Sequence, residues 1–217
     1  MSMGIDLGYI AAVIIVILLS MTLHEAMHAF TSYWLGDDTA KLQGRLTLNP
    51  LAHIDPFLTL LLPIGLAIAG LPIFGGAKPV PFNPYRVKYG EFGAALVGVA
   101  GPLTNLVIAF IAFGIFALAG APSAGSTLGM VLQLTVIVNL GFFIFNILPI
   151  PPLDGSRVLY ALAPEGARRV MEIIEQYGVL LIFAIVLLAS PLIGQFMGAA
   201  IDFFLGLFAQ IFGVSVV

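Results

Sequence analysis

The apolar stretch of residues 9–30 contains three ionisable residues in its last third, His24, Glu25 and His28, in the pattern His-Glu-x-x-His. About 20 helical residues cross the hydrocarbon core of a bilayer, so the stretch is long enough to form one transmembrane helix. A carboxylate at that depth costs about 3 kcal/mol unless it has a partner. Two histidines four residues apart lie on one face of a helix, where both imidazoles can bind one metal ion. The stretch therefore predicts a membrane helix that carries a metal site, with Glu25 beside it as a proton acceptor for water.

The composition extends this interpretation to the whole chain of 217 residues. Hydrophobic residues make up 60% and charged residues 9%, and the mean hydropathy is +1.11, which is outside the usual range of a soluble domain. We therefore expect an all-α polytopic membrane protein, in contact with the lipid bilayer and not with nucleic acid. One membrane-embedded domain would cover residues 1–217, with a catalytic core at about 9–160 and C-terminal helices at about 165–217. Because cysteine is absent, the metal ligands must be histidines and carboxylates.

The apolar runs predict about five to six transmembrane helices. Besides residues 9–30, the runs 92–119 and 128–148 are of spanning length, and the runs 178–190 and 192–214 are most simply two more spans. The run 57–71 is short and contains Pro63, Gly65 and Gly70, so it is either re-entrant or a short crossing. A hairpin-like loop is expected at 72–91, where it could offer a strand edge to a peptide or merely connect two helices.

Asp154 is the strongest candidate for a third metal ligand. A catalytic zinc site needs three protein ligands and one open position, and the prolines at 149–152 open the chain just ahead of this carboxylate. If residues 57–71 crossed the bilayer, Asp154 would emerge roughly 20 Å or more from the histidines, at 1.5 Å per helical residue. The site can close only if residues 57–71 dip in and return.

The basic residues support the same topology. With a re-entrant 57–71, all eight lysines and arginines lie on one side of the membrane, whereas a full crossing divides them 2 to 6. The positive-inside rule favours the first arrangement and makes that side cytoplasmic. We therefore expect a multi-pass protein of the cell membrane, with its N-terminus outside and its metal site toward the cytoplasm.

Four further residues are candidates for the site, each with a structural alternative. Asn146 could donate a hydrogen bond to the oxyanion of a transition state, or it could bond a neighbouring helix. Gly101 and Asn105 favour close helix packing over substrate contact. His53 could be a rim residue or a fourth ligand, although a loop histidine bonded to nearby backbone is the favoured interpretation.

Three motifs in this order resemble the site-2 protease family of intramembrane zinc metalloproteases, in its short form without a PDZ or CBS domain. They are His24-Glu25-Ala26-Met27-His28, Gly101-Pro102-Leu103-Thr104-Asn105 and the stretch from Asn146 to Gly155. The resemblance implies one Zn²⁺ held by His24, His28 and Asp154, with Glu25 as the catalytic base. It also implies that Asn146 assists the transition state, and that an earlier protease trims the substrate first.

The expected function is hydrolysis of peptide bonds in or near transmembrane segments of membrane proteins, as in regulated intramembrane proteolysis. The alternative from another class is a divalent metal-ion transporter or channel, in which the same histidines and Asp154 form a transit site. A third possibility is a membrane scaffold that binds client helices without cleaving them. Replacement of Glu25 by Gln separates the three, because only the protease needs this carboxylate for its chemistry.

Overall fold

The computed structural model describes residues 6–71 and 75–214, and these residues form helices and connections with no β-strand. Four helices are long and apolar enough to cross a membrane, namely α1 (Leu7–Trp34), α4 (Glu91–Leu118), α5 (Thr127–Asn146) and α9 (Ser190–Phe212). The prediction of an all-α polytopic membrane protein is confirmed.

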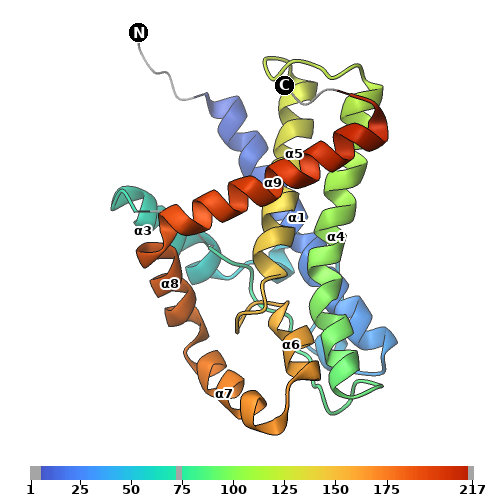
Figure 1. The fold of residues 1–217 in the computed structure, drawn as a ribbon, viewed down its shortest axis with the longest axis vertical. Coiled ribbons are helices and arrows are strands. Elements are labelled where there is room, and N and C mark those ends of the chain that lie inside the picture. Colours follow the sequence, from blue (N-terminus) through green and yellow to red (C-terminus); the bar gives the residue numbers. More distant parts are fainter. Residues whose placement is uncertain (1–5, 72–74, 215–217) are drawn as a thin grey trace.

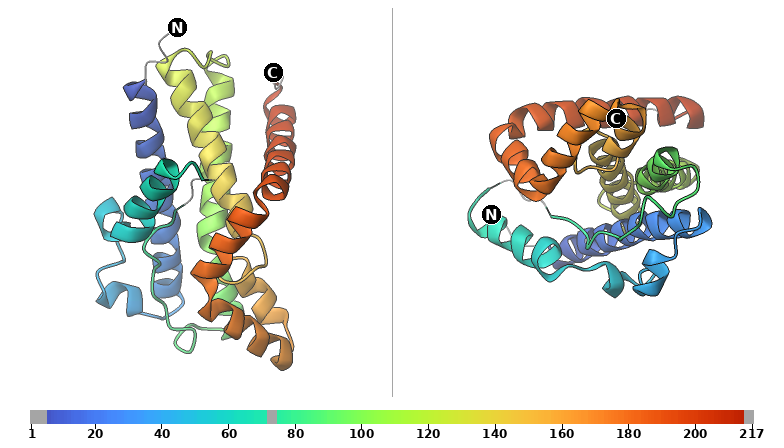
Figure 2. Two further views of the ribbon diagram at one scale, coloured as in Figure 1. Left: turned by 90° about the vertical axis from the view of Figure 1, so that its left-hand side faces the viewer. Right: turned by 90° about the horizontal axis from the view of Figure 1, so that it is seen from below.

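Helices α1, α4 and α5 lie side by side and form the centre of the molecule (Figures 1 and 2). Asp6 caps α1 by accepting the N–H groups of Gly8 and Tyr9, and Ser126 caps α5 by accepting that of Gly129. The turn at 119–126 connects α4 to α5 at the end of the bundle where α1 begins. The opposite end therefore contains the histidine end of α1, the start of α4 and the end of α5.

Residues 57–71 do not carry the chain across the bundle. A π-helical turn (Pro56–Leu61), capped by Asp55, leads into the short helix α3 (Leu62–Ile68). After α3 the chain returns to its own starting point, because Gly76 N–H donates to the Leu58 carbonyl at 3.1 Å and Thr59 Oγ1 donates to the Gly76 carbonyl at 2.7 Å. The chain therefore turns back over residues 57–71, as a re-entrant segment would.

The predicted hairpin-like loop at 72–91 is an extended connection without a strand in its described part, residues 75–90. Residues 72–74 of that prediction lie outside the described residues. Two short helices, α2 (Thr39–Leu42) and the 3₁₀ helix Pro50–His53, occupy the preceding loop. The two loops are joined by hydrogen bonds, among them Lys78 N–H to the His53 carbonyl at 2.9 Å.

The C-terminal part contains one full span where two were expected. After α6 (Ser156–Leu162) and α7 (Glu165–Gln176), the run at 178–190 forms only the 11-residue helix α8 (Gly178–Leu188), which is too short to cross alone. Helices α7 and α8 are long enough to cross a membrane only if they count as one span, and the two helices are bent by 82° relative to each other. By length and composition, the described residues thus contain four helices able to cross a membrane, or five if that bent pair is one span. Hydropathy alone does not report such a bend.

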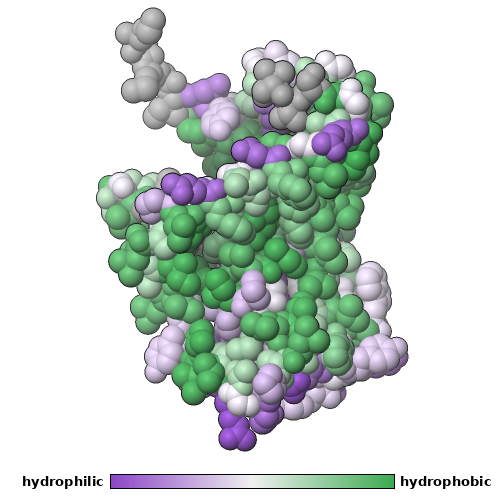
Figure 3. Space-filling view, in the orientation of Figure 1, coloured by the Kyte–Doolittle hydropathy of each residue, from purple (hydrophilic) through white to green (hydrophobic). Residues whose placement is uncertain are grey.

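Helix α9 crosses the bundle obliquely (Figure 1). It packs on α4 and α5 through phenylalanines. The Phe208 ring lies 5.2 Å from Phe110 and 5.7 Å from Phe113 of α4, and the Phe204 ring lies 5.4 Å from Phe143 of α5. Hydrophobic side chains dominate the surface between the two ends of the molecule (Figure 3). Such a surface matches a bilayer and not water.

Candidate metal centre

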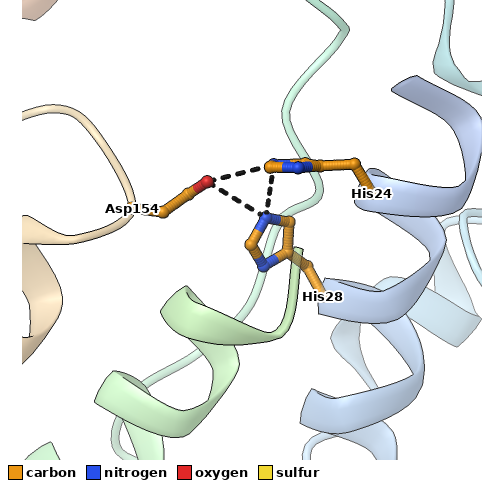
Figure 4. A group of neighbouring side chains, drawn as sticks. All are labelled: His24, His28 and Asp154. Carbon is orange, nitrogen blue, oxygen red and sulfur yellow. Dashed lines mark hydrogen bonds and ion pairs between the residues drawn. The ribbon is translucent and has the colours of Figure 1, made fainter. Parts of the chain in front are cut away.

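His24 and His28 of α1 converge with Asp154, which lies in the connection between α5 and α6 (Figure 4). His24 Nε2 is 3.0 Å from His28 Nε2 and 3.0 Å from Asp154 Oδ2, and His28 Nε2 is 3.4 Å from the same oxygen. Both histidines are buried, and Asp154 is partly exposed. Asp154 thus lies beside the two histidines, as expected from the sequence.

The three atoms have the separations that a zinc ion requires. Zn²⁺ binds imidazole nitrogen and carboxylate oxygen at about 2.0–2.2 Å in a tetrahedron, which separates the ligand atoms by roughly 3.4 Å. The observed separations of 3.0 to 3.4 Å are close to that value. Three protein ligands also leave the fourth position open, as catalytic zinc sites do.

The hydrogen bonds behind the imidazoles turn both Nε2 lone pairs toward the centre. His28 Nδ1 lies 2.7 Å from the Val97 carbonyl of α4, which can only accept, so the His28 proton is on Nδ1. His24 Nδ1 lies 2.6 Å from Asn105 Oδ1, also in α4. Two nitrogen lone pairs and a carboxylate oxygen then face one point without a donor between them, and such a set attracts a cation.

Gly101 of α4 provides the space for the two imidazoles. A Cβ at this position would come 2.6 Å from His24 Nε2 and closer still to His28 Nε2. Gly98, one turn earlier, lies close to the Asp154 carbonyl, which a Cβ would approach to 2.8 Å. The surroundings of Gly101 favour the expected role in close helix packing, because its neighbours are the two histidines.

Asp154 reaches the histidines because the chain opens after α5. The prolines at 149–152 cannot continue the helix, and Gly155 N–H then bonds back to the Asn146 carbonyl at 2.7 Å. A Cβ at Gly155 would come 2.8 Å from the Leu148 carbonyl and closer to that of Ile147, so only glycine fits this turn. Asn146 thus holds the Asp154 turn through its main chain, while its side chain donates to the Phe142 carbonyl at 3.0 Å.

Glu25 is held by the extended loop that follows α3. Its Oε2 accepts the Val80 N–H at 3.0 Å, which leaves Oε1 free of protein hydrogen bonds among the described residues. The sequence could not reveal this contact, because every non-proline residue offers the same backbone N–H.

His53 lies outside the metal group and is fully buried. Its Nε2 is 2.9 Å from the Thr47 carbonyl, and its Nδ1 is 3.4 Å from Arg45 Nη2. Its surroundings are those of the loop histidine bonded to nearby backbone, and they offer no contact with a bound ion.

Arg45 is a residue of this region that the sequence analysis missed. Its Nη2 donates to the Lys78 carbonyl, and its Nε is buried without a partner. Burial lowers the pKa of the Arg45 guanidinium below its usual range, an effect that the negative charge of Glu25 opposes. Two residues after Lys78, Val80 contacts Glu25, so Arg45 and His53 fix the backbone that holds the carboxylate.

The chain is similar to zinc metalloproteases in sequence. The family "Peptidase family M50" matches residues 114–190. The chain is 42% identical over 207 residues to "Putative zinc metalloprotease YwhC" of Bacillus subtilis, covering 92% of this chain and 91% of that protein. It is 33% identical over 198 residues to "Putative zinc metalloprotease Rip2" of Mycolicibacterium smegmatis, covering 87% and 72%. No solved structure matches the chain. On the identity and coverage of these relatives, the chain belongs to peptidase family M50, the site-2 protease family of zinc metalloproteases.

Proposed function

We propose that this protein is an intramembrane endopeptidase that hydrolyses peptide bonds in or next to the transmembrane segments of other membrane proteins. One observation supports this most strongly: three acceptor atoms of His24, His28 and Asp154 lie within 3.4 Å of one another on a bundle of spanning helices. A metal centre of catalytic type at that depth faces substrates that are themselves in the membrane.

In this mechanism His24, His28 and Asp154 hold the ion, and Glu25 handles protons. When bound, zinc supplies Lewis acidity, which polarises a peptide carbonyl and makes water more acidic. Glu25 accepts a proton from the attacking water at its free Oε1 and delivers it to the leaving amine. The Val80 N–H on Oε2 fixes the carboxylate in one orientation, so the proton-accepting oxygen is defined.

An apolar cavity that is lined in part by Leu153, the residue before Asp154, supports an apolar substrate. It has a volume of about 350 Å³ and lies between the end of α5, the Asp154 connection and helices α8 and α9. Its lining contains no polar residue: Phe145, Leu148, Ile150, Leu153, Ile182, Ile185, Leu192, Ile193 and Phe196. We infer that it accepts an aliphatic or aromatic side chain of a substrate segment. Because helical carbonyls are already hydrogen-bonded, that segment must unwind before cleavage.

The distribution of charge supports an orientation in the cell membrane. All eight lysines and arginines lie at 41–88 and 157–169, at the end of the bundle that contains the metal group. The other end, with the start of α1 and the turn at 119–126, has none among the described residues. By the positive-inside rule the metal group faces the cytoplasm, which supplies its water.

The test is cleavage of single-span membrane substrates by purified, zinc-loaded protein in detergent. Each substrate is supplied whole and with its extracytoplasmic part removed, since an earlier trimming step is expected. The Glu25→Gln variant should retain zinc and lose cleavage by roughly 10²- to 10⁴-fold, because it lacks the proton acceptor. The matched control is Glu165→Gln, which removes an exposed carboxylate paired with Arg169 on α7.

The same pair of variants separates the alternatives. Equal cleavage by wild type and Glu25→Gln would reject the assignment. In proteoliposomes, zinc flux that survives Glu25→Gln, without any cleavage, would instead indicate a transporter. Binding of a substrate helix that is never cut, and that Glu25→Gln leaves unchanged, would indicate a scaffold.

A further inference from the structure

A chain of buried amide groups lies behind His24, between α1, α4 and α5. Asn105 Nδ2 donates to Asn139 Oδ1 at 2.8 Å, and Asn139 Nδ2 donates to Ser20 Oγ and to the Thr135 carbonyl, each at 2.8 Å. Asn105 and Asn139 have no exposed surface, and Ser20 is 3% exposed. This network of hydrogen bonds ends at His24 Nδ1, which is 2.6 Å from Asn105 Oδ1.

Two backbone carbonyls, those of Thr135 and Ser20, determine the direction of the hydrogen bonds in this network. A backbone carbonyl can only accept, so the Asn139 group that faces it must be the NH₂. The Asn139 oxygen is then left for Asn105, whose NH₂ points toward it at 2.8 Å. The same NH₂ makes a longer contact of 3.4 Å to the Ser20 carbonyl, so Asn139 provides the closer of its two acceptors. The Asn105 oxygen is left for His24, so His24 carries its proton on Nδ1 and its lone pair on Nε2.

We propose that Asn139 is a positioning residue for the metal centre, acting through Asn105 to fix the tautomer and the ring orientation of His24. The Nε2 lone pair of His24 faces Asp154 and His28, which is the arrangement a zinc ligand needs. The two histidines differ in this respect. His28 obtains the same tautomer directly from the Val97 carbonyl, whereas His24 depends on two side-chain amides that could rotate if their partners were lost.

The proposal is tested by zinc affinity, measured by competition with a chelator on the full chain in detergent. Asn139→Leu keeps the branched shape and the number of heavy atoms of the side chain but removes the closer acceptor of Asn105, which leaves Asn105 only the longer contact to the Ser20 carbonyl. Asn105 can then turn its NH₂ toward His24 and favour a proton on Nε2. Because partners of this kind contribute about 10- to 100-fold to metal affinity, the zinc dissociation constant should rise by that factor.

The matched control is Leu140→Ala, the next residue of α5, which is fully buried in the apolar core. It damages packing without touching the amide chain, so its zinc affinity should stay near the wild-type value while its thermal stability falls. Asn139→Asp should restore binding to within about threefold, because a carboxyl group buried this deeply stays protonated and can both accept from Asn105 and donate to Thr135.

Unchanged zinc affinity in Asn139→Leu would overturn the proposal, as would an equal loss in Leu140→Ala or no rescue by Asn139→Asp. If Asn139→Leu does not accumulate as folded protein, Asn139→Ala makes the same test. The inference rests on the zinc site and not on the substrate. Since the measurement needs no cleavage, failure of the peptidase assignment and failure of this proposal give different results.

Discussion

Gly101 lies against His24 so closely that a methyl group on its α-carbon would come 2.6 Å from the Nε2 atom. Carbon and nitrogen atoms without a bond between them do not approach to that distance, so a side chain at this position would displace the imidazoles.

Replacement of Gly101 by Ala should therefore abolish zinc binding while α4 stays helical, because alanine is the better helix former. The measurement is bound zinc per chain after gel filtration. Gly141→Ala is the control, since a Cβ at Gly141 in α5 meets no atom within 4 Å. A Gly101→Ala variant that still carries stoichiometric zinc would show that the imidazoles do not need this space.

Removal of the His53 side chain should slow cleavage with zinc still bound. The His53 side chain lies 3.4 Å from Arg45 Nη2, which donates to the Lys78 carbonyl, and two residues later Val80 orients Glu25. A catalytic group that is misplaced by about 1 Å can lose roughly 100-fold in rate, so His53→Ala should lower kcat and leave the zinc dissociation constant unchanged. The two quantities are measured by steady-state cleavage and chelator competition. Loss of zinc in this variant would instead make His53 a ligand.

A bulky side chain in the apolar cavity should compete with the substrate. Ile185 lines this cavity from α8, and Ile185→Trp should raise KM or abolish cleavage without an effect on zinc affinity. Leu188→Trp, at an exposed position of the same helix, serves as the control and should behave as wild type. Identical cleavage by the two variants would remove this cavity from the substrate path.

The topology can be tested with single cysteines, because the natural chain has none. A cysteine at Ser123, in the turn between α4 and α5, should react with an impermeant maleimide added outside intact cells. A cysteine at Lys88, just before α4, should react only after the cells are opened. The reverse pattern would invert the orientation inferred from the basic residues.

The sequence predicted the residues whose chemistry depends on spacing along one element. His24 and His28 share a helix face because they are four apart, and Asp154 follows a break that proline imposes. The return of residues 57–71 followed from their length together with the need to bring these ligands together.

What the sequence could not predict depends on contacts between distant elements. The hydrogen bond from Val80 N–H to Glu25 uses a backbone group that nearly every residue has, so no residue type in the sequence indicates it. Asn139 cannot be distinguished in the sequence from any intramembrane asparagine that bonds a neighbouring helix. The run at 178–190 was expected to be a full span, but it forms the 11-residue helix α8, which follows an 82° bend after α7. The angle of such a bend depends on packing and not on hydropathy.

The ligands of the metal centre come from positions 130 residues apart along the chain, His24 and Asp154. A bound ion consequently acts as a crosslink that ties the first helix to the C-terminal half, much as a disulfide would in a chain that had cysteines. Any species that binds only the folded state adds RT ln(1 + [L]/Kd) to its stability. The melting temperature of this protease should therefore rise with the concentration of free zinc. Removal of zinc should lower the stability of the fold as well as abolish activity.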